Sequence, residues 1–201
     1  AHGLKSIVGM EATLVGGAHA VLLVRDREGY ANIGRLSTEA HRDRPKGQPE
    51  LSREVLARHT TGLVGLSGCG LGEIPAVALA GDPDRATRLA GEYAEMFEQG
   101  CFFLELQDHL QEEERITANA LLEVAGRAGL GVVATNDVHY HVPQRRRLQD
   151  ILTCIKHTET LMTAGRKLRP NGEFYLKSAA AMERLFRDVP EAIRNTLRIA
   201  R

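Results

Sequence analysis

The chain has 201 residues, enough for one large domain with a well-filled core. Its 26 Lys and Arg balance 26 Asp and Glu, so the formal net charge is zero and a generic polyanion-binding surface is not indicated. With aromatic residues at 4% and no Trp, an aromatic platform for stacking single-stranded nucleic acid is not indicated either. The apolar runs are too short to cross a bilayer, so we expect no membrane association.

The cysteines are odd in number and widely spaced, at Cys69, Cys101 and Cys154, without a Cys-x-x-Cys pair. This pattern is typical of reduced thiols and predicts a cytoplasmic protein. The start has neither a signal peptide nor an initiating Met, and it resembles the end of a helix that leads into a strand. We therefore expect the chain to be part of a longer protein.

Along the chain, apolar runs typical of strands alternate with amphipathic helical stretches, which predicts an α/β fold with a mostly parallel sheet. The expected strands are 6–15, 20–25, 63–67, 101–107 and 131–135, with Gly16 and Gly17 forming the first turn. The expected helices are about 27–41, a short one beginning at Ser52, then 72–80, 82–97, 112–128, 143–157, 178–187 and 190–200. The character of the sequence changes after Tyr140, where a mainly helical segment begins.

Four of the apolar runs end in residues able to bind metal: Glu11, Cys69, His109, and the pair Asp137 and His139. The carboxyl ends of parallel strands meet at one edge of a sheet, and chemistry is commonly placed there. In extended backbone, residues i and i+2 point the same way, so the Asp137 carboxylate and the His139 imidazole can meet one ion. Such a donor set suits Zn²⁺, Mn²⁺ or Fe.

Each of these residues also has an ordinary structural interpretation. Asp137 with His139 fits a turn with a surface histidine, and His109 fits a helix cap or an exposed side chain. Glu11 fits a solvated carboxylate, and Cys69 fits a small buried residue. Their recurrence at equivalent places favours a metal site over five independent coincidences.

Two further motifs each allow a functional and a structural interpretation. The glycines at 68, 70 and 72 resemble a nucleotide-binding turn, but they depart from Gly-x-Gly-x-x-Gly and lack the acidic residue expected after a second strand. Arg145, Arg146 and Arg147 lie in the first turn of an expected helix, where cations oppose the helix dipole. A solvated basic turn balanced by Asp150 is favoured there, and contact with phosphate or a partner is the alternative.

The ordered motifs resemble the polymerase and histidinol phosphatase (PHP) domain of the bacterial DNA polymerase III alpha chain. They are Ile7–Glu11, Gly62–Cys69, Phe103–His109 and Val133–Tyr140, continued by Leu148–Ile155 and Glu173–Ser178. A smaller set leans toward the error-prone branch of that family: Glu73–Ala76, Val138–Pro143 and Arg169–Phe174. The resemblance covers essentially the whole chain.

The resemblance implies a distorted (β/α)7-type barrel with a cluster of divalent metal ions (Zn, Mn or Fe) at the carboxyl ends of its strands. Its ligands would include Glu11, Cys69, His109, Asp137 and His139, and the others would lie in N-terminal motifs that we do not find here. We expect residues 1–142 to be the barrel portion, incomplete at its N-terminus. Residues 143–201 would end the domain and lead toward a polymerase core, absent from this sequence, with its own Mg²⁺ site.

The resemblance further implies that the parent protein is a DNA-directed DNA polymerase acting on DNA and deoxynucleotides with other replisome subunits. Three hypotheses follow for the PHP portion. It is a metal-dependent phosphoesterase with 3′–5′ exonuclease activity, or a non-hydrolytic domain that supports the polymerase or a partner. The third, a stand-alone phosphatase, is disfavoured because residues 143–201 resemble the polymerase's own continuation. For the isolated chain we expect weak metal binding and no hydrolysis.

Overall fold

The computed structural model describes residues 6–201. Its centre is a five-stranded sheet in the order β1-β2-β3-β4-β5. The strands are β1 (Gly9–Thr13), β2 (His19–Val24), β3 (Leu63–Leu66), β4 (Phe102–Leu106) and β5 (Gly131–Ala134). The helix end expected before the first strand falls on residues 1–5, outside the described part.

From β2 onward, helices separate the strands as the sequence predicts, so the α/β fold class is confirmed. They are α1 (Arg27–His41), α2 (Arg53–Ala57), α3 (Glu73–Leu79), α4 (Pro83–Met96), α5 (Glu112–Ala128), α6 (Arg146–His157), α7 (Ala179–Leu185) and α8 (Pro190–Ala200). Short 3₁₀ turns, η1 (Pro143–Arg145) and η2 (Gly165–Lys167), precede and follow α6. No helix within residues 6–201 combines the length and the apolar character that a membrane crossing needs.

The sheet is mixed, so the expectation of a mostly parallel sheet was wrong. β1 pairs antiparallel with β2, and β2 antiparallel with β3, whereas β3, β4 and β5 pair in parallel. Gly16 and Gly17, with φ of 95° and 86°, close β1 and β2 into a tight hairpin, and a hairpin forces antiparallel pairing. Consequently β1, β3, β4 and β5 all run in one direction and only β2 opposes them.

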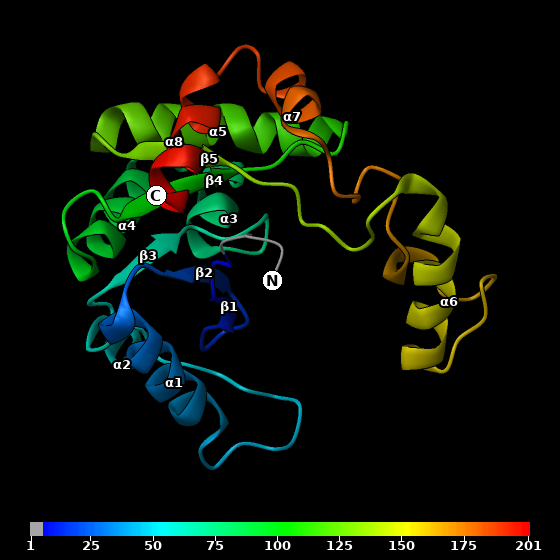
Figure 1. Ribbon diagram of the computed structural model, residues 1–201, viewed down its shortest axis with the longest axis horizontal. Helices are drawn as coiled ribbons and strands as arrows, with labels where there is room; N and C mark the ends of the chain where they lie inside the picture. Colours follow the sequence, from blue (N-terminus) through cyan, green and yellow to red (C-terminus); the bar gives the residue numbers. More distant parts are fainter. Residues whose placement is uncertain (1–5) are drawn as a thin grey trace.

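The core lies between the sheet and its helices. β3 and β4 are buried along their whole length, and α3, α4 and α5 pack together beside them (Figure 1). Helix α8 packs against β5, and the Asn195 side chain of α8 donates a hydrogen bond from Nδ2 to the Val132 carbonyl oxygen of β5 at 2.8 Å. Within residues 6–201, β1 and β5 do not pair with each other, so closure into a barrel stays a prediction.

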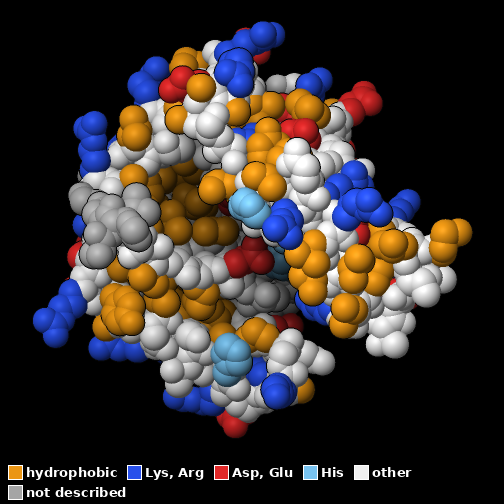
Figure 2. Space-filling view, turned by 45° about the vertical axis from the view of Figure 1, so that its right-hand side comes forward, with side chains coloured by type: hydrophobic (Ala, Val, Ile, Leu, Met, Phe, Trp, Pro, Cys, Tyr) orange, Lys and Arg blue, Asp and Glu red, His pale blue; other side chains and the backbone are white. Residues whose placement is uncertain are grey.

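The α6 region stands apart from the body of the protein (Figure 1). Two long segments lead to it and back, and they meet in an isolated bridge between Tyr140 and Tyr175. One face of α6 carries exposed apolar side chains at helical spacing, visible as an apolar lobe in Figure 2: Leu148, Ile151, Leu152 and Ile155. The helix therefore presents an unpartnered apolar stripe to solvent.

Candidate metal site

The strand directions bring the candidate residues to one edge of the sheet. Glu11 lies inside β1, Cys69 follows β3, and His109 follows β4. Asp137 and His139 follow β5. Since β1, β3, β4 and β5 point the same way, the residues that follow β3, β4 and β5 lie beyond the carboxyl edge, whereas Glu11 lies in the middle of β1 and not at its end, as the sequence had suggested. The antiparallel strand β2 begins at that same edge.

His19, at the start of β2, joins two of the predicted ligands. Its Nδ1 lies 3.5 Å from Glu11 Oε1 and 3.9 Å from Cys69 Sγ. In the hairpin, Glu11 is opposite Val21 and His19 is opposite Thr13, so Glu11 and His19 are diagonal neighbours on one face. Sequence reasoning found no partner for His19. The signal that could have identified Glu11 as its partner is the hairpin register, which can be counted outward from the Gly16-Gly17 turn.

Asp137 and His139 also meet, with Asp137 Oδ1 3.2 Å from His139 Nε2. The backbone between them is not extended as expected, because Asp137 has a φ of 33°, and Asp tolerates a positive φ better than most residues. Arg169 holds the pair: its Nη2 is 3.1 Å from Asp137 Oδ2 and also contacts His139 Nε2. The guanidinium packs on the Phe174 ring at 4.8 Å. A side-chain cation thus lies where this carboxylate and imidazole converge.

His109 is completely buried, with 0% of its surface exposed. Its Nδ1 lies 2.7 Å from Glu114 Oε1, its Nε2 lies 3.2 Å from the Asn136 carbonyl oxygen, and its ring stacks on Phe174 at 3.9 Å. Burial by itself raises the pKa of Glu114, but hydrogen bonds from the His109 ring and backbone N–H outweigh burial and lower it. Both nitrogens of His109 are therefore engaged in this conformation, and its role as a ligand stays a prediction.

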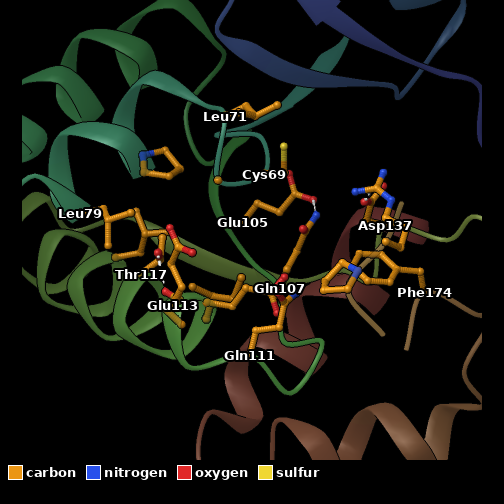
Figure 3. A pocket seen from close by; sticks show the side chains of 18 of the residues that line it. Cys69, Leu71, Leu79, Glu105, Gln107, Gln111, Glu113, Thr117, Asp137 and Phe174 are labelled. Carbon is orange, nitrogen blue, oxygen red and sulfur yellow. Dashed lines mark hydrogen bonds and ion pairs between the residues drawn. The ribbon is translucent and has the colours of Figure 1, made fainter. Parts of the chain in front are cut away.

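A cavity of about 540 Å³ opens beside these residues, with Cys69, Glu105 and Asp137 on its wall (Figure 3). Helix α5 contributes Glu113 and Thr117 to the opposite side. Sequence reasoning did not select Glu105, because it lies within β4 rather than at the end of the strand. Its carboxylate oxygen Oε2 is buried and has no hydrogen-bond partner within residues 6–201.

Negative charge is concentrated around this cavity. Burial raises the pKa of the Cys69 thiol, and the nearby Glu105, Glu11 and Asp137 raise it further. Burial likewise raises the pKa of Glu105, with added contributions from Asp137 and Glu11, although hydrogen bonds from Thr135 and Gln107 act in the opposite sense. Each of these groups would be stabilised in its charged form by a cation.

The residue types fit a divalent metal ion, because carboxylate, imidazole and thiolate donors suit Zn²⁺, Mn²⁺ or Fe and Glu105 offers an unsatisfied oxygen. The geometry is not that of a closed metal site: in the described part of the chain, no three His, Cys, Asp or Glu side chains are grouped so that they could hold an ion. Instead there are two partial groupings, one around His19 and one at Asp137 and His139. Metal binding by Asp137 and His139 together would require Arg169 to move.

The three arginines before and within α6 differ in their surroundings. Arg146 Nη2 donates to the Arg169 carbonyl at 3.0 Å, and Arg146 Nε lies 3.8 Å from Asp150 Oδ2. Arg146 is thus hydrogen-bonded to the backbone of the loop that carries Arg169, while Arg145 and Arg147 are exposed. Contact of these arginines with phosphate or a partner stays a prediction.

Comparison with known proteins identifies the class. The family model of the PHP domain matches residues 1–109, more than half of the chain, so the chain belongs to the PHP-domain family. The resemblance inferred from the motifs is confirmed.

The most informative relatives are DNA polymerases and DNA polymerase subunits from bacteria. The chain is 38% identical over 215 residues to the error-prone DNA polymerase of Symbiobacterium thermophilum, covering 98% of this chain and 20% of that protein. It is 35% identical over 214 residues to the DNA polymerase III subunit alpha of Treponema pallidum, and 34% identical over 219 residues to that of Thermus aquaticus. Each match covers 100% of this chain and 18% of the relative. The chain thus spans about a fifth of the length of these curated relatives. Both branches match, so the lean toward the error-prone branch stays a prediction.

Proposed function

We propose that this chain is the PHP portion of a bacterial DNA polymerase III-type alpha subunit, a DNA-directed DNA polymerase of the cytoplasm. Its substrates would be DNA and deoxynucleotides, and its partners other replisome subunits. We further propose that its strand-end residues bind divalent metal for phosphodiester hydrolysis, as in 3′–5′ removal of a primer terminus. The observation that carries the second proposal is the cavity at the carboxyl edge, where Cys69, Glu105 and Asp137 lie on one wall.

The residues would divide the work by their chemistry. A bound divalent ion supplies Lewis-acid stabilisation of negative charge on phosphoryl oxygens. Glu11 and Asp137 would hold it with hard carboxylate oxygens, and His139 with an imidazole nitrogen. Cys69 would contribute as thiolate, which a cation favours over the thiol. His109, fixed by Glu114, would need to exchange a present partner for the ion.

A second candidate, a PHP domain that no longer hydrolyses and supports the polymerase or a partner, is favoured by a specific observation. Arg169 already neutralises Asp137 and contacts His139, so this half of the site is satisfied without metal. If that pairing persists in the full-length protein, the site is structural. The two candidates differ in whether the full-length protein hydrolyses a primer end when chelatable metal is present.

The test is hydrolysis of a primer with a mismatched 3′ end by the full-length protein, with and without Mn²⁺ and after chelation. Asp137→Asn and His139→Gln should each reduce metal-dependent cleavage by about a hundredfold or more, because each removes a ligand. Primer extension, which uses separate residues, should persist and show that the protein is intact. Asp43→Asn is a matched control, because Asp43 also has a positive φ (57°) but lies in an exposed loop after α1.

Wild-type protein that extends primers but never shortens them would support the structural candidate. Cleavage that survives both substitutions would show that it arises elsewhere. For the isolated 201-residue chain we expect weak metal binding and no hydrolysis.

We also propose that residues 1–142 form the barrel portion and that residues 143–201 connect it to the polymerase core. The exposed apolar stripe on α6 supports this division, because such a face is suited to packing against another part of a longer polypeptide. Limited proteolysis of the full-length protein tests it: α6 should be protected. Rapid cleavage within α6 would count against the proposal.

A further inference from the structure

Glu105 is an unusual residue for its place in the fold. β4 runs Phe102–Leu106 and is buried at every position, and Glu105 is only 6% exposed. An ionised carboxylate in such a place is strongly unfavourable unless it is paired or hydrogen-bonded. The position therefore needs a reason beyond strand formation.

The hydrogen bonds of Glu105 fix its side chain but satisfy only one oxygen. Oε1 accepts from Thr135 Oγ1 at 2.5 Å and from Gln107 Nε2 at 2.9 Å. The Glu105 backbone N–H donates to Ser67 Oγ at 2.9 Å, which ties this point of β4 to the end of β3. Oε2 is buried and has no hydrogen-bond partner among the described residues. The carboxylate is thus held in place with one oxygen free.

The free oxygen belongs to a side chain that lies between two predicted metal ligands. Glu105 sits on the cavity wall between Cys69 and Asp137, which come from the ends of β3 and β5 on either side of β4 (Figure 3). Within residues 6–201, both hydrogen bonds to the Glu105 carboxylate, from Thr135 and Gln107, are accepted by Oε1. Glu11 and Asp137 place further negative charge near Glu105, whereas Arg169, which also lines the cavity, is paired with Asp137.

We propose that Glu105 is an additional ligand of the divalent metal site, binding through Oε2. The inference rests on the proposed metal site and extends it to a residue within a strand. A carboxylate oxygen is a hard donor suited to Mn²⁺ and Zn²⁺, and a cation at this place would compensate a buried carboxylate whose Oε2 has no hydrogen-bond partner within residues 6–201. Thr135 and Gln107 then act as positioning residues that hold Oε1 and orient Oε2.

The experiment measures metal affinity rather than activity. Full-length protein is stripped with a chelator, and Zn²⁺ affinity is determined by competition with a chromophoric chelator. Four variants are compared with wild type: Glu105→Gln, Asp137→Asn as reference, Glu113→Gln as matched control, and Glu105→Asp. Glu113 lines the same cavity but is exposed on α5. Glu113→Gln therefore removes one carboxylate charge from the cavity while the buried carboxylate of Glu105 stays in place.

Glu105→Gln should weaken Zn²⁺ binding by about tenfold or more, and Glu113→Gln should leave it unchanged. If Asp137→Asn weakens binding but Glu105→Gln does not, the inference is overturned and the proposed metal site stands. If wild type does not bind Zn²⁺, or binds it no more tightly than Asp137→Asn does, the proposed metal site is refuted and the inference is refuted with it. Circular dichroism checks that Glu105→Gln is folded. If it is not, Glu105→Asp decides: it keeps the charge but withdraws the oxygen by one methylene, so unchanged affinity overturns the inference.

Discussion

Arg169 should compete with metal for Asp137 and His139, and Arg169→Gln should therefore tighten metal binding. The guanidinium lies 3.1 Å from Asp137 Oδ2 and contacts His139 Nε2, so a divalent ion must displace it before both side chains are free. The ion pair is partly solvated, with 38% of the Arg169 side chain and 30% of the Asp137 side chain exposed. A pair of this kind contributes up to about 1 kcal/mol.

Removal of that competition should raise metal affinity by up to about fivefold, since about 1.4 kcal/mol corresponds to tenfold. The assay is the same Zn²⁺ competition on full-length protein. Arg166→Gln is the matched control, because Arg166 lines the same cavity and is exposed but makes no ion pair with Asp137. Affinity that is unchanged or weaker in Arg169→Gln, with Arg166→Gln equal to wild type, would refute the competition and show that Arg169 instead positions the pair.

Two predictions concern stability. Gly65→Ala in β3 would place a Cβ 2.4 Å from Phe97 Cζ, and the overpacking should lower the free energy of unfolding by about 1–3 kcal/mol, measured with urea. Gly91→Ala in α4, with open space around it, should instead raise it by up to about 1 kcal/mol, and equal stability of both variants would contradict the close packing of β3 on Phe97. Burial raises the pKa of Glu105 in the folded, metal-free protein, so its contribution to stability is fully present below the unfolded pKa and is lost as pH rises through the folded one. Glu105→Gln has no ionisable group at this position, so its free energy of unfolding does not fall in this way. With metal removed by a chelator, the free energy of unfolding of Glu105→Gln relative to wild type should therefore increase as pH rises above about 4.3. A difference between the two proteins that does not change with pH would count against the burial of an ionisable Glu105.

The secondary structure was predictable because its signals are local. Asp82 and Pro83 predict the start of α4, and the Asp82 side chain accepts from the Arg85 backbone N–H at 3.0 Å as a cap should. Ser52 caps α2 in the same way through Val55. Such signals involve residues three apart and do not depend on the rest of the fold.

What the sequence left open depends on contacts between distant segments. His19 reaches Glu11 only through the register of the first hairpin, and Arg169 reaches Asp137 only because a long loop folds back from α6. Glu105 was overlooked because a single acidic residue in an apolar run does not reveal which of its oxygens are satisfied. Four of the candidate ligands, Cys69, His109, Asp137 and His139, could be selected because they follow strands, but their partners could not be predicted.

The central claim is that the carboxyl edge of this sheet binds divalent metal through Asp137 and its neighbours. The most direct measurement is the metal content of purified full-length protein by mass spectrometry, before and after the double substitution Asp137→Asn with His139→Gln. We predict that wild type retains a tightly bound divalent metal through gel filtration and that the double variant, still active in primer extension, loses it. Equal metal content in the two proteins, or none in either, would contradict the claim.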